Sequence, residues 1–360
     1  PRTARRVSIL IAGAISGVAI MTRYVIRRLI QAIPTFFGIT ILTFIIVYSA
    51  PGDPVLQQTF SPRISGAARE ELRRRLGVDQ PMTVQYLNWL IGNDWQHDPE
   101  LLPRRGILRG DFGSSLIEKR PVLEMIGERL GATLLLTGTA TLIGYSLGIP
   151  IGVYAAVRRG GFFDNASRIL AVVLNSVPSF WLSLIAILVF SVKFHEWGLP
   201  TMPSGGMYTL SVDGTGGFNL SDRLVHLLPP ALVLATGPIA SVSRLMRTQV
   251  LEVIHQDYVR AARAKGLYER TIYFRHALRN ALIPLATILG PTLTGLLNGA
   301  VITETIWSWP GLGRLFVNAN FQRDYPVILA GFVLGAVGVI LGNLLSDVLY
   351  GMIDPRVRLD

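Results

Sequence analysis

Hydrophobic residues in this chain of 360 residues are gathered into six long stretches. Each stretch has at least 20 residues and contains no Asp, Glu, Lys or Arg. A helix of about 20 apolar residues spans the hydrocarbon core of a bilayer. The stretches are continuous and do not alternate with period two, so they predict membrane-spanning helices and not a β-barrel. The six predicted spans are 29–50, 131–157, 169–192, 224–243, 281–303 and 325–346.

Composition agrees with an all-α integral membrane protein. Half of the residues are hydrophobic, 16% are charged and the mean hydropathy is +0.43, whereas soluble domains carry about 25% charged residues. The chain has no cysteine, which excludes disulfides, thiolate metal sites and a cysteine nucleophile. The net charge of +11 leaves open whether the chain binds nucleic acid or is oriented in a membrane.

The distribution of charge decides that question. The segments 1–28, 158–168, 244–279 and 351–360 together carry 19 basic and 6 acidic residues. The segments 51–130, 193–223 and 304–324 carry 15 basic and 16 acidic residues. The positive-inside rule therefore predicts that the first set is cytoplasmic, with both termini inside. The excess charge is an orientation signal, and we expect no nucleic-acid partner.

The connecting segments differ in character. Residues 1–28 are interpreted as a cytoplasmic N-terminal extension and 351–360 as a cytoplasmic tail. The segment 51–130 is too long for a simple connection and predicts a small extracytoplasmic unit. Short helices are expected within it at 65–77, 82–91 and 121–130, on the basis of helical periodicity and capping residues.

The basic segment 244–279 predicts a docking site. Its alanines at 261, 262 and 264 make a helix with little side-chain bulk, and Gly266 ends that helix. Another protein could approach such a helix closely. A second helical stretch follows, so we favour docking over a merely solvated basic loop.

Several motifs resemble the permeases of ABC importers for dipeptides and oligopeptides. The residues RAARAKG (260–266) are similar to the Glu-Ala-Ala-x-x-x-Gly motif of such permeases, with Arg260 in place of the Glu. The resemblance covers nearly the whole chain from residue 21. The other motifs that carry it, in chain order, are APGDP (50–54), GDFGS (110–114), VPSFW (177–181), WPGLGR (309–314), RDYP (323–326) and YGMIDPRVR (350–358).

The resemblance implies a type I ABC importer permease fold with a permease core over 131–350, in a bacterial or archaeal cell membrane. It implies a heterodimer with a second homologous permease, two cytoplasmic ATPases and an extracytoplasmic solute-binding protein. The coupling helix that an ATPase would bind comprises Asp257, Tyr258, Arg260, Ala261, Ala262, Ala264, Lys265 and Gly266. The chain has no phosphate-binding G-x-x-x-x-G-K-[ST] sequence, so we expect no cofactor and no enzymatic activity here, with ATP and Mg²⁺ on the partner ATPases.

The spans lack the features of two other classes of membrane protein. An ion-coupled secondary transporter would show intramembrane charges and inverted repeats, and an intramembrane hydrolase would show a catalytic set. Neither pattern is present in the spans. The solute stays open between dipeptides, oligopeptides, nickel and glutathione.

Several individual residues in and near the spans are expected to have structural roles and not functional ones. We expect helix packing from the spaced glycines and from Pro178, and interfacial positions for Glu304 and Asp347. Arg244 and Arg247 are expected to contact lipid. Trp307 and Trp309 fit an interfacial belt or re-entrant loop. His226 and His276 lack a second ligand at metal spacing, so no metal site is expected.

Overall fold

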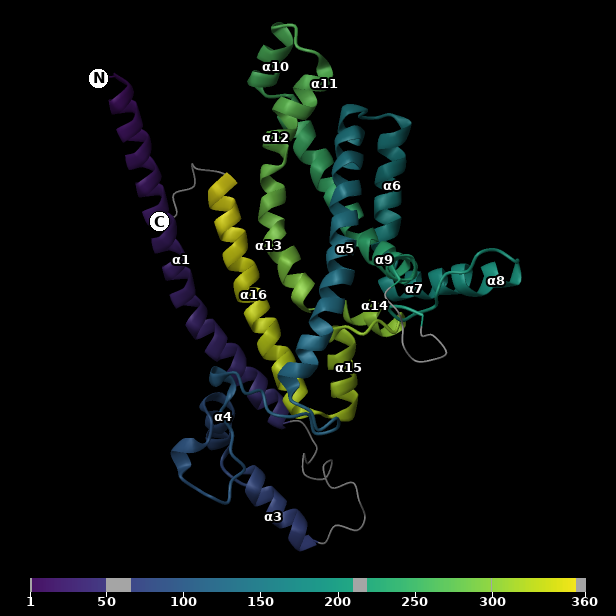
Figure 1. The fold of residues 1–360 in the computed structure, drawn as a ribbon. Coiled ribbons are helices and arrows are strands. Elements are labelled where there is room, and N and C mark those ends of the chain that lie inside the picture. Colours follow the sequence, from purple (N-terminus) through teal and green to yellow (C-terminus); the bar gives the residue numbers. More distant parts are fainter. Residues whose placement is uncertain (1, 50–65, 210–218, 299, 354–360) are drawn as a thin grey trace.

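The protein is built almost wholly from helices. The computed structural model describes residues 2–49, 66–209, 219–298 and 300–353 (Figure 1). Across these ranges the only β-pairing is an isolated bridge between Ser114 and Pro121. The predicted all-α class is confirmed.

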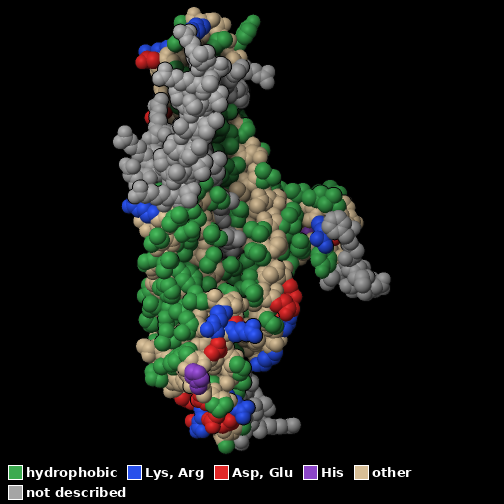
Figure 2. Space-filling model, turned by 60° about the vertical axis from the view of Figure 1, so that its left-hand side comes forward, with side chains coloured by type: hydrophobic (Ala, Val, Ile, Leu, Met, Phe, Trp, Pro, Cys, Tyr) green, Lys and Arg blue, Asp and Glu red, His purple; other side chains and the backbone are tan. Residues whose placement is uncertain are grey.

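Six helical segments in the described residues are long and apolar enough to cross a membrane, and each overlaps one predicted stretch. Hydrophobic side chains cover much of the middle of the face in Figure 2, while charged side chains gather toward its ends. The prediction of six membrane spans is therefore confirmed. The segments are Tyr24–Ser49, Val122–Val157, Ser179–Glu196, Leu220–Ile254, Ile283–Ile306 and Tyr325–Val348.

Four of the spans belong to long helices that extend beyond the predicted stretches. The first, α1 (Arg2–Ser49), is continuous through the expected N-terminal extension. The others are α5 (Val122–Val157), α9 (Leu220–Ile254) and α16 (Tyr325–Ile353). Because α9 continues to Ile254, the predicted boundary at 243 between span and coupling segment lies inside one helix.

The stretch predicted as one helix over 169–192 is broken in two. The helix α6 (Phe162–Ser176) ends before Val177, and α7 (Ser179–Ile187) begins after Pro178. Proline disfavours helical geometry in the residue before it, and Val177 is extended with ψ 125°. The expectation that Pro178 acts mainly in packing is wrong, because the proline separates two helices. A π-turn, η3 (Leu188–Lys193), and the short α8 (Phe194–Glu196) continue α7, which projects sideways from the bundle in Figure 1.

The fifth predicted stretch, 281–303, is divided among shorter elements. After α10 (Asp257–Ala264) come α11 (Glu269–Thr271), the π-turn η4 (Ile272–Ala277) and α12 (Leu278–Ala281). The elements that follow are α13 (Ile283–Asn298), α14 (Val301–Ile306) and α15 (Leu312–Gln322).

The segment between the first two spans forms a small helical unit at one end of the molecule (Figure 1). It contains α3 (Gly66–Leu76), α4 (Met82–Ile91) and the 3₁₀ turns η1 (Asp94–Gln96) and η2 (Ile107–Arg109). The third helix expected there, 121–130, is instead the first part of α5. We call this end the α4 end, and the opposite end, where α10 lies, the α10 end.

A buried tie links the α4 end to the start of α16. The Ser115 hydroxyl donates to Asp324 Oδ2 (2.5 Å), and the Leu116 N–H donates to Asp324 Oδ1 (3.0 Å). Asp324 is buried. Asp324 belongs to the motif 323–326, and its two donors directly follow the motif 110–114. These hydrogen bonds therefore hold the two motifs close together.

The glycines on α5 allow α9 to pack closely against it. A Cβ at Gly144 would lie 2.5 Å from Pro238 Cβ, and one at Gly148 would lie 2.9 Å from Val242 Cβ. Small residues permit this approach of two membrane helices, as the sequence predicts. Gly295, another of the spaced glycines, would meet nothing within 4 Å among the described residues, so it does not bring two helices of this chain together.

Some sequence-based expectations fall outside the described residues. They concern the motif 50–54 and the tail beyond 353, and also the placement of residue 299 and of the His276 side chain.

Candidate functional site

The basic segment contains the amphipathic helix α10, which stands at one end of the bundle (Figure 1). Asp257 lies in its first turn and Arg263 in its last turn. Each charge therefore has the sign that the helix dipole favours at its position. The eight-residue helix is stabilised locally at both ends.

Gly266 ends this helix in the predicted place. Its φ of +76° is a left-handed conformation that costs glycine little. The Gly266 N–H donates to Arg263 O (2.9 Å) and the Leu267 N–H donates to Ala262 O (3.4 Å). These two bonds form the glycine-terminated end typical of helices.

The helix has one face toward the bundle and one face toward the outside. Val259 is 0% exposed and Ala262 is 8% exposed, and both join a buried cluster with Met246 and Val250 of α9 and Ile272 of η4. Ala262, one of the predicted contact residues, therefore anchors the helix and does not face outward. The predicted residues that are exposed are Asp257, Arg260, Ala261, Ala264, Lys265 and Gly266.

Two polar contacts fix the same helix against its neighbours. The half-buried Tyr258 accepts a hydrogen bond at its hydroxyl from Asn280 Nδ2 (2.8 Å). Arg263 Nη2 donates to the Tyr273 hydroxyl (3.2 Å). Tyr258 is thus a positioning residue, and these contacts hold α10 in a fixed orientation against η4 and α12.

Two exposed apolar side chains at the tip were missed by the sequence analysis. Leu267 is 40% exposed and Tyr268 is 85% exposed. They follow the terminating glycine directly, which is the signal that could have identified them. Together with the exposed Ala261 and Ala264, they add apolar groups to a surface whose other exposed side chains are mostly charged.

The ion pairs on this face are long and exposed to solvent. Arg260 Nη1 lies 3.6 Å from Asp257 Oδ1, and Arg263 Nε lies 3.8 Å from Glu269 Oε1. All four side chains are exposed, so these ion pairs contribute little to stability. These ion pairs could therefore be replaced by ion pairs with another protein at little cost in stability.

A buried ion pair stands behind this surface and joins α6 to α9. Arg247 Nε lies 2.5 Å from Asp164 Oδ1, and its Nη2 donates to Oδ2 (2.9 Å). Asp164 is 1% exposed and also accepts from the Gly160 N–H (2.9 Å). The Arg247 hydrogen bond lowers the pKa of Asp164 to about 2. The expectation that Arg247 contacts lipid is wrong, because its guanidinium binds this carboxylate.

A second polar cluster lies nearer the α4 end, around Glu304 of α14. Glu304 is 0% exposed, so its expected interfacial position is wrong. Its Oε1 accepts from the Thr133 hydroxyl (2.9 Å), and its Oε2 accepts from the Arg314 N–H (3.1 Å). A Cβ at Gly311 would collide with this carboxyl group, and one at Gly313 would lie 2.9 Å from Oε2. The motif 309–314 is therefore wrapped around one buried acid.

The two tryptophans beside this cluster do not form an interfacial belt. Trp307 and Trp309 are both buried. Trp309 Nε1 donates to the Ala132 carbonyl (2.8 Å), whereas Trp307 Nε1 is a buried donor that has no hydrogen-bond partner among the described residues. The hydrophobic pattern could not show that these side chains point into the protein.

Nothing in the described ranges offers a metal centre. No group of three or more His, Asp or Glu side chains lies close enough to hold an ion there.

Comparison with known proteins decides the family. Residues 148–359 match the model of the "Binding-protein-dependent transport system inner membrane component", and residues 21–137 match the model of its N-terminal part. The chain belongs to this family. It is an ABC importer permease subunit and a multi-pass membrane protein.

Individual relatives match along almost their whole length. An "Oligopeptide transport system permease protein AppB" of Bacillus subtilis is 43% identical over 339 residues, covering 94% of this chain and 100% of that protein. A "Dipeptide transport system permease protein DppB" of Escherichia coli K12 is 40% identical, covering 94% and 99%. A "Di/tripeptide transport system permease protein DppB" of Pseudomonas aeruginosa is also 40% identical, with the same coverage.

Proposed function

We propose that this chain forms half of the translocation pathway of an ATP-driven importer for peptides. The relatives named for oligopeptide, dipeptide and di/tripeptide transport are at least 40% identical over nearly the full chain, which supports peptides over nickel or glutathione. The other half of the pathway would come from a homologous permease, and an extracytoplasmic binding protein would deliver the peptide.

The energy for transport would come from two separate ATPase subunits, one of which would bind α10 of this chain. The observation that carries this proposal is the division of α10 into a buried anchor, Val259 and Ala262, and an outer face of small and basic side chains. Because Ala261 and Ala264 project little, a groove on the ATPase could approach the helix backbone. A rigid anchor to α9 and η4 would transmit ATPase movement to the spans on either side. ATP and Mg²⁺ would be held by the ATPases.

A bulky side chain on the outer face tests the docking. We expect Ala261→Trp, in the complex expressed with its ATPase subunits, to reduce ATPase co-purification about tenfold or more. Ala67→Trp is the matched control, because Ala67 is an exposed helical alanine of α3 at the opposite end. Stoichiometric ATPase on the Ala261→Trp variant would contradict the docking role.

The absence of cysteine makes orientation directly testable. We propose that the α10 end is cytoplasmic, as its basic residues suggest. In the permease expressed without its ATPase subunits, a single cysteine at Ala264 should react with a membrane-impermeant maleimide only after the cell membrane is opened. One at Ala67 should react in cells whose cell membrane is intact and accessible from outside. The reverse labelling would overturn the orientation.

The solute is tested by uptake. Cells or proteoliposomes with the complete transporter should accumulate a labelled dipeptide or oligopeptide in an ATP-dependent way, and unlabelled peptide should compete. Competition by nickel or glutathione, with none by peptides, would exclude the peptide proposal and leave the permease assignment intact.

A further inference from the structure

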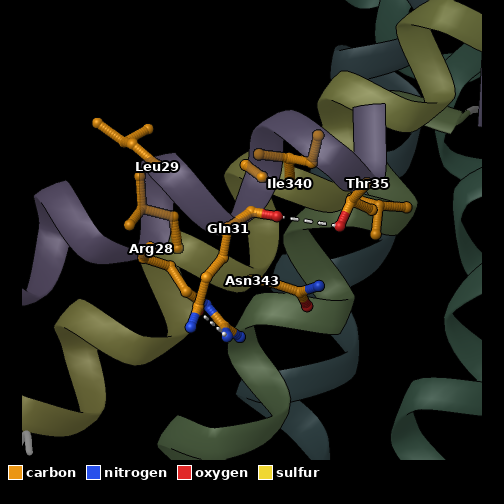
Figure 3. Close-up of a pocket in the computed structure, with 9 residues that line it drawn as sticks. Arg28, Leu29, Gln31, Thr35, Ile340 and Asn343 are labelled. Atoms are coloured by element: carbon orange, nitrogen blue, oxygen red, sulfur yellow. Dashed lines mark hydrogen bonds between the residues drawn. The ribbon is translucent and has the colours of Figure 1, made fainter. Parts of the chain in front are cut away.

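A small cavity lies between α1 and α16, toward the α10 end of both helices. Its volume is about 150 Å³. Figure 3 shows the polar ends of Arg28 and Gln31 of α1 in this space, with Asn343 across from them on α16. Apolar side chains, including Leu29 and Ile340, also line it. The site therefore joins charged, amide and apolar groups on the outer surface of two membrane helices.

Both amide side chains lie within candidate spans, Gln31 seven residues after the start of Tyr24–Ser49 and Asn343 five residues before the end of Tyr325–Val348. Gln31 accepts a hydrogen bond from Arg28 Nη1 (3.5 Å), and Thr35 donates to the Gln31 carbonyl (3.2 Å). Asn343 is exposed, and its amide has no hydrogen-bond partner among the residues that the structure describes. An amide near the end of a span gains from a hydrogen-bonding group within reach, because less water is available there than in bulk solvent. The Asn343 amide therefore calls for a polar group supplied by the surroundings.

Arg28 is the charged residue that lines the cavity, and its charged neighbours determine the local net charge. Arg28 Nε lies 2.8 Å from Asp347 Oδ2, so one arginine is balanced by one carboxylate. Arg27, the next residue on α1, is exposed and has no ion pair within the described residues. The three described charged groups leave a net charge of +1, which favours an anion.

We propose that this cavity binds the phosphate–glycerol end of an anionic phospholipid. The phosphate would lie at Arg27 and Arg28, an ester carbonyl would accept from the Asn343 amide, and one acyl chain would follow the apolar side chains of the groove. Ligand cavities for drug-sized molecules measure about 300–1,000 Å³, so a volume half that size fits only one end of a larger molecule. Basic pockets between membrane helices are known to select anionic headgroups in this way.

Native mass spectrometry of the full transporter complex, incubated with phosphatidylglycerol and phosphatidylethanolamine, tests this site. The double variant Arg27→Gln/Arg28→Gln should reduce retained phosphatidylglycerol about tenfold, without affecting phosphatidylethanolamine. Arg105→Gln/Arg109→Gln is the matched control, because Arg109 likewise pairs with one carboxylate, Asp94, but at the α4 end. The control should retain phosphatidylglycerol at the unmodified level.

A second variant separates binding from loss of the Arg28–Asp347 pair. Asn343→Leu leaves every charge in place and should still weaken phosphatidylglycerol retention severalfold. If Arg27→Gln/Arg28→Gln and Asn343→Leu both retain as much phosphatidylglycerol as the unmodified transporter, the proposal is overturned. So would displacement of the lipid by millimolar inorganic phosphate, which would identify a free anion site, or loss of a self-associated species without loss of lipid, which would identify a protein partner.

Discussion

The Glu304 cluster and the outer face of α10 are both polar, yet the first is buried and the second is exposed. Glu304 is completely buried and receives hydrogen bonds from Thr133 and from the Arg314 backbone. On α10 the charged side chains are exposed, and their ion-pair distances are 3.6 Å and 3.8 Å. The first set is buried and bonded within the chain, whereas the second set is exposed to solvent and could also contact another protein.

This difference distinguishes residues that stabilise the fold from residues that could bind a partner. A buried acid with well-placed donors is expensive to disturb, because each donor that loses its partner stays buried. Exposed ion pairs have little effect on stability, so substitutions there report on binding instead. Stability and partner binding should therefore respond to different residues.

The largest effect is expected at Glu304. Glu304→Leu would remove the acceptor of the Thr133 hydroxyl, the Arg314 N–H and the Ala300 N–H, at a cost of about 4 kcal/mol in unfolding free energy for these buried and partly buried donors. Glu304→Gln keeps one acceptor oxygen and should cost about half as much. Thermal unfolding of the purified protein in detergent measures both.

The control for this prediction is an exposed acid near the same end. Glu118→Gln should change the melting temperature little, because Glu118 is exposed and its nearest cation, on Arg129, lies 3.9 Å away. If Glu304→Leu and Glu118→Gln melt alike, the cluster around 309–314 does not depend on the buried carboxyl group.

The Asp164–Arg247 pair should come next in size. Asp164→Asn removes a charge-assisted contact and should cost about 2 kcal/mol in unfolding free energy. Because the folded-state pKa of Asp164 is about 2, below the ordinary 3.8, the pair stabilises fully above about pH 4 and weakens as pH falls toward 2. Melting temperatures at pH 7 and pH 3 should show a smaller difference between wild type and variant at the lower pH.

The α10 helix offers a comparison between neighbouring alanines. Ala262→Trp should lower the free energy of unfolding by about 1–3 kcal/mol, because it overfills the cluster around Val259 and Ile272. Ala261→Trp lies on the exposed face and should leave the melting temperature unchanged while it weakens ATPase binding. Equal stability losses at both positions would mean that the helix does not have the two faces described.

The sequence predicted the features that depend on local composition, and missed those that depend on distant contacts. Six spans follow from apolar length, and the end of α10 follows from Gly266. The burial of Glu304 depends on Thr133, which is 171 residues away in the sequence. The partner of Arg247 is 83 residues away. The interruption at Pro178 was available locally, but the apolar run on both sides concealed it.

The smallest expected effect compares the two buried tryptophans, which would lose a similar volume on replacement by phenylalanine. Trp309→Phe removes the Nε1 bond to the Ala132 carbonyl and should cost about 1 kcal/mol more than the matched change at Trp307. Trp307→Phe removes a buried donor that no described residue accepts from, so the gain from losing that donor offsets part of the lost packing. The difference between the two melting temperatures isolates the hydrogen bond, because packing losses largely cancel. Equal melting temperatures would show that the Ala132 contact adds nothing to the stability of this end.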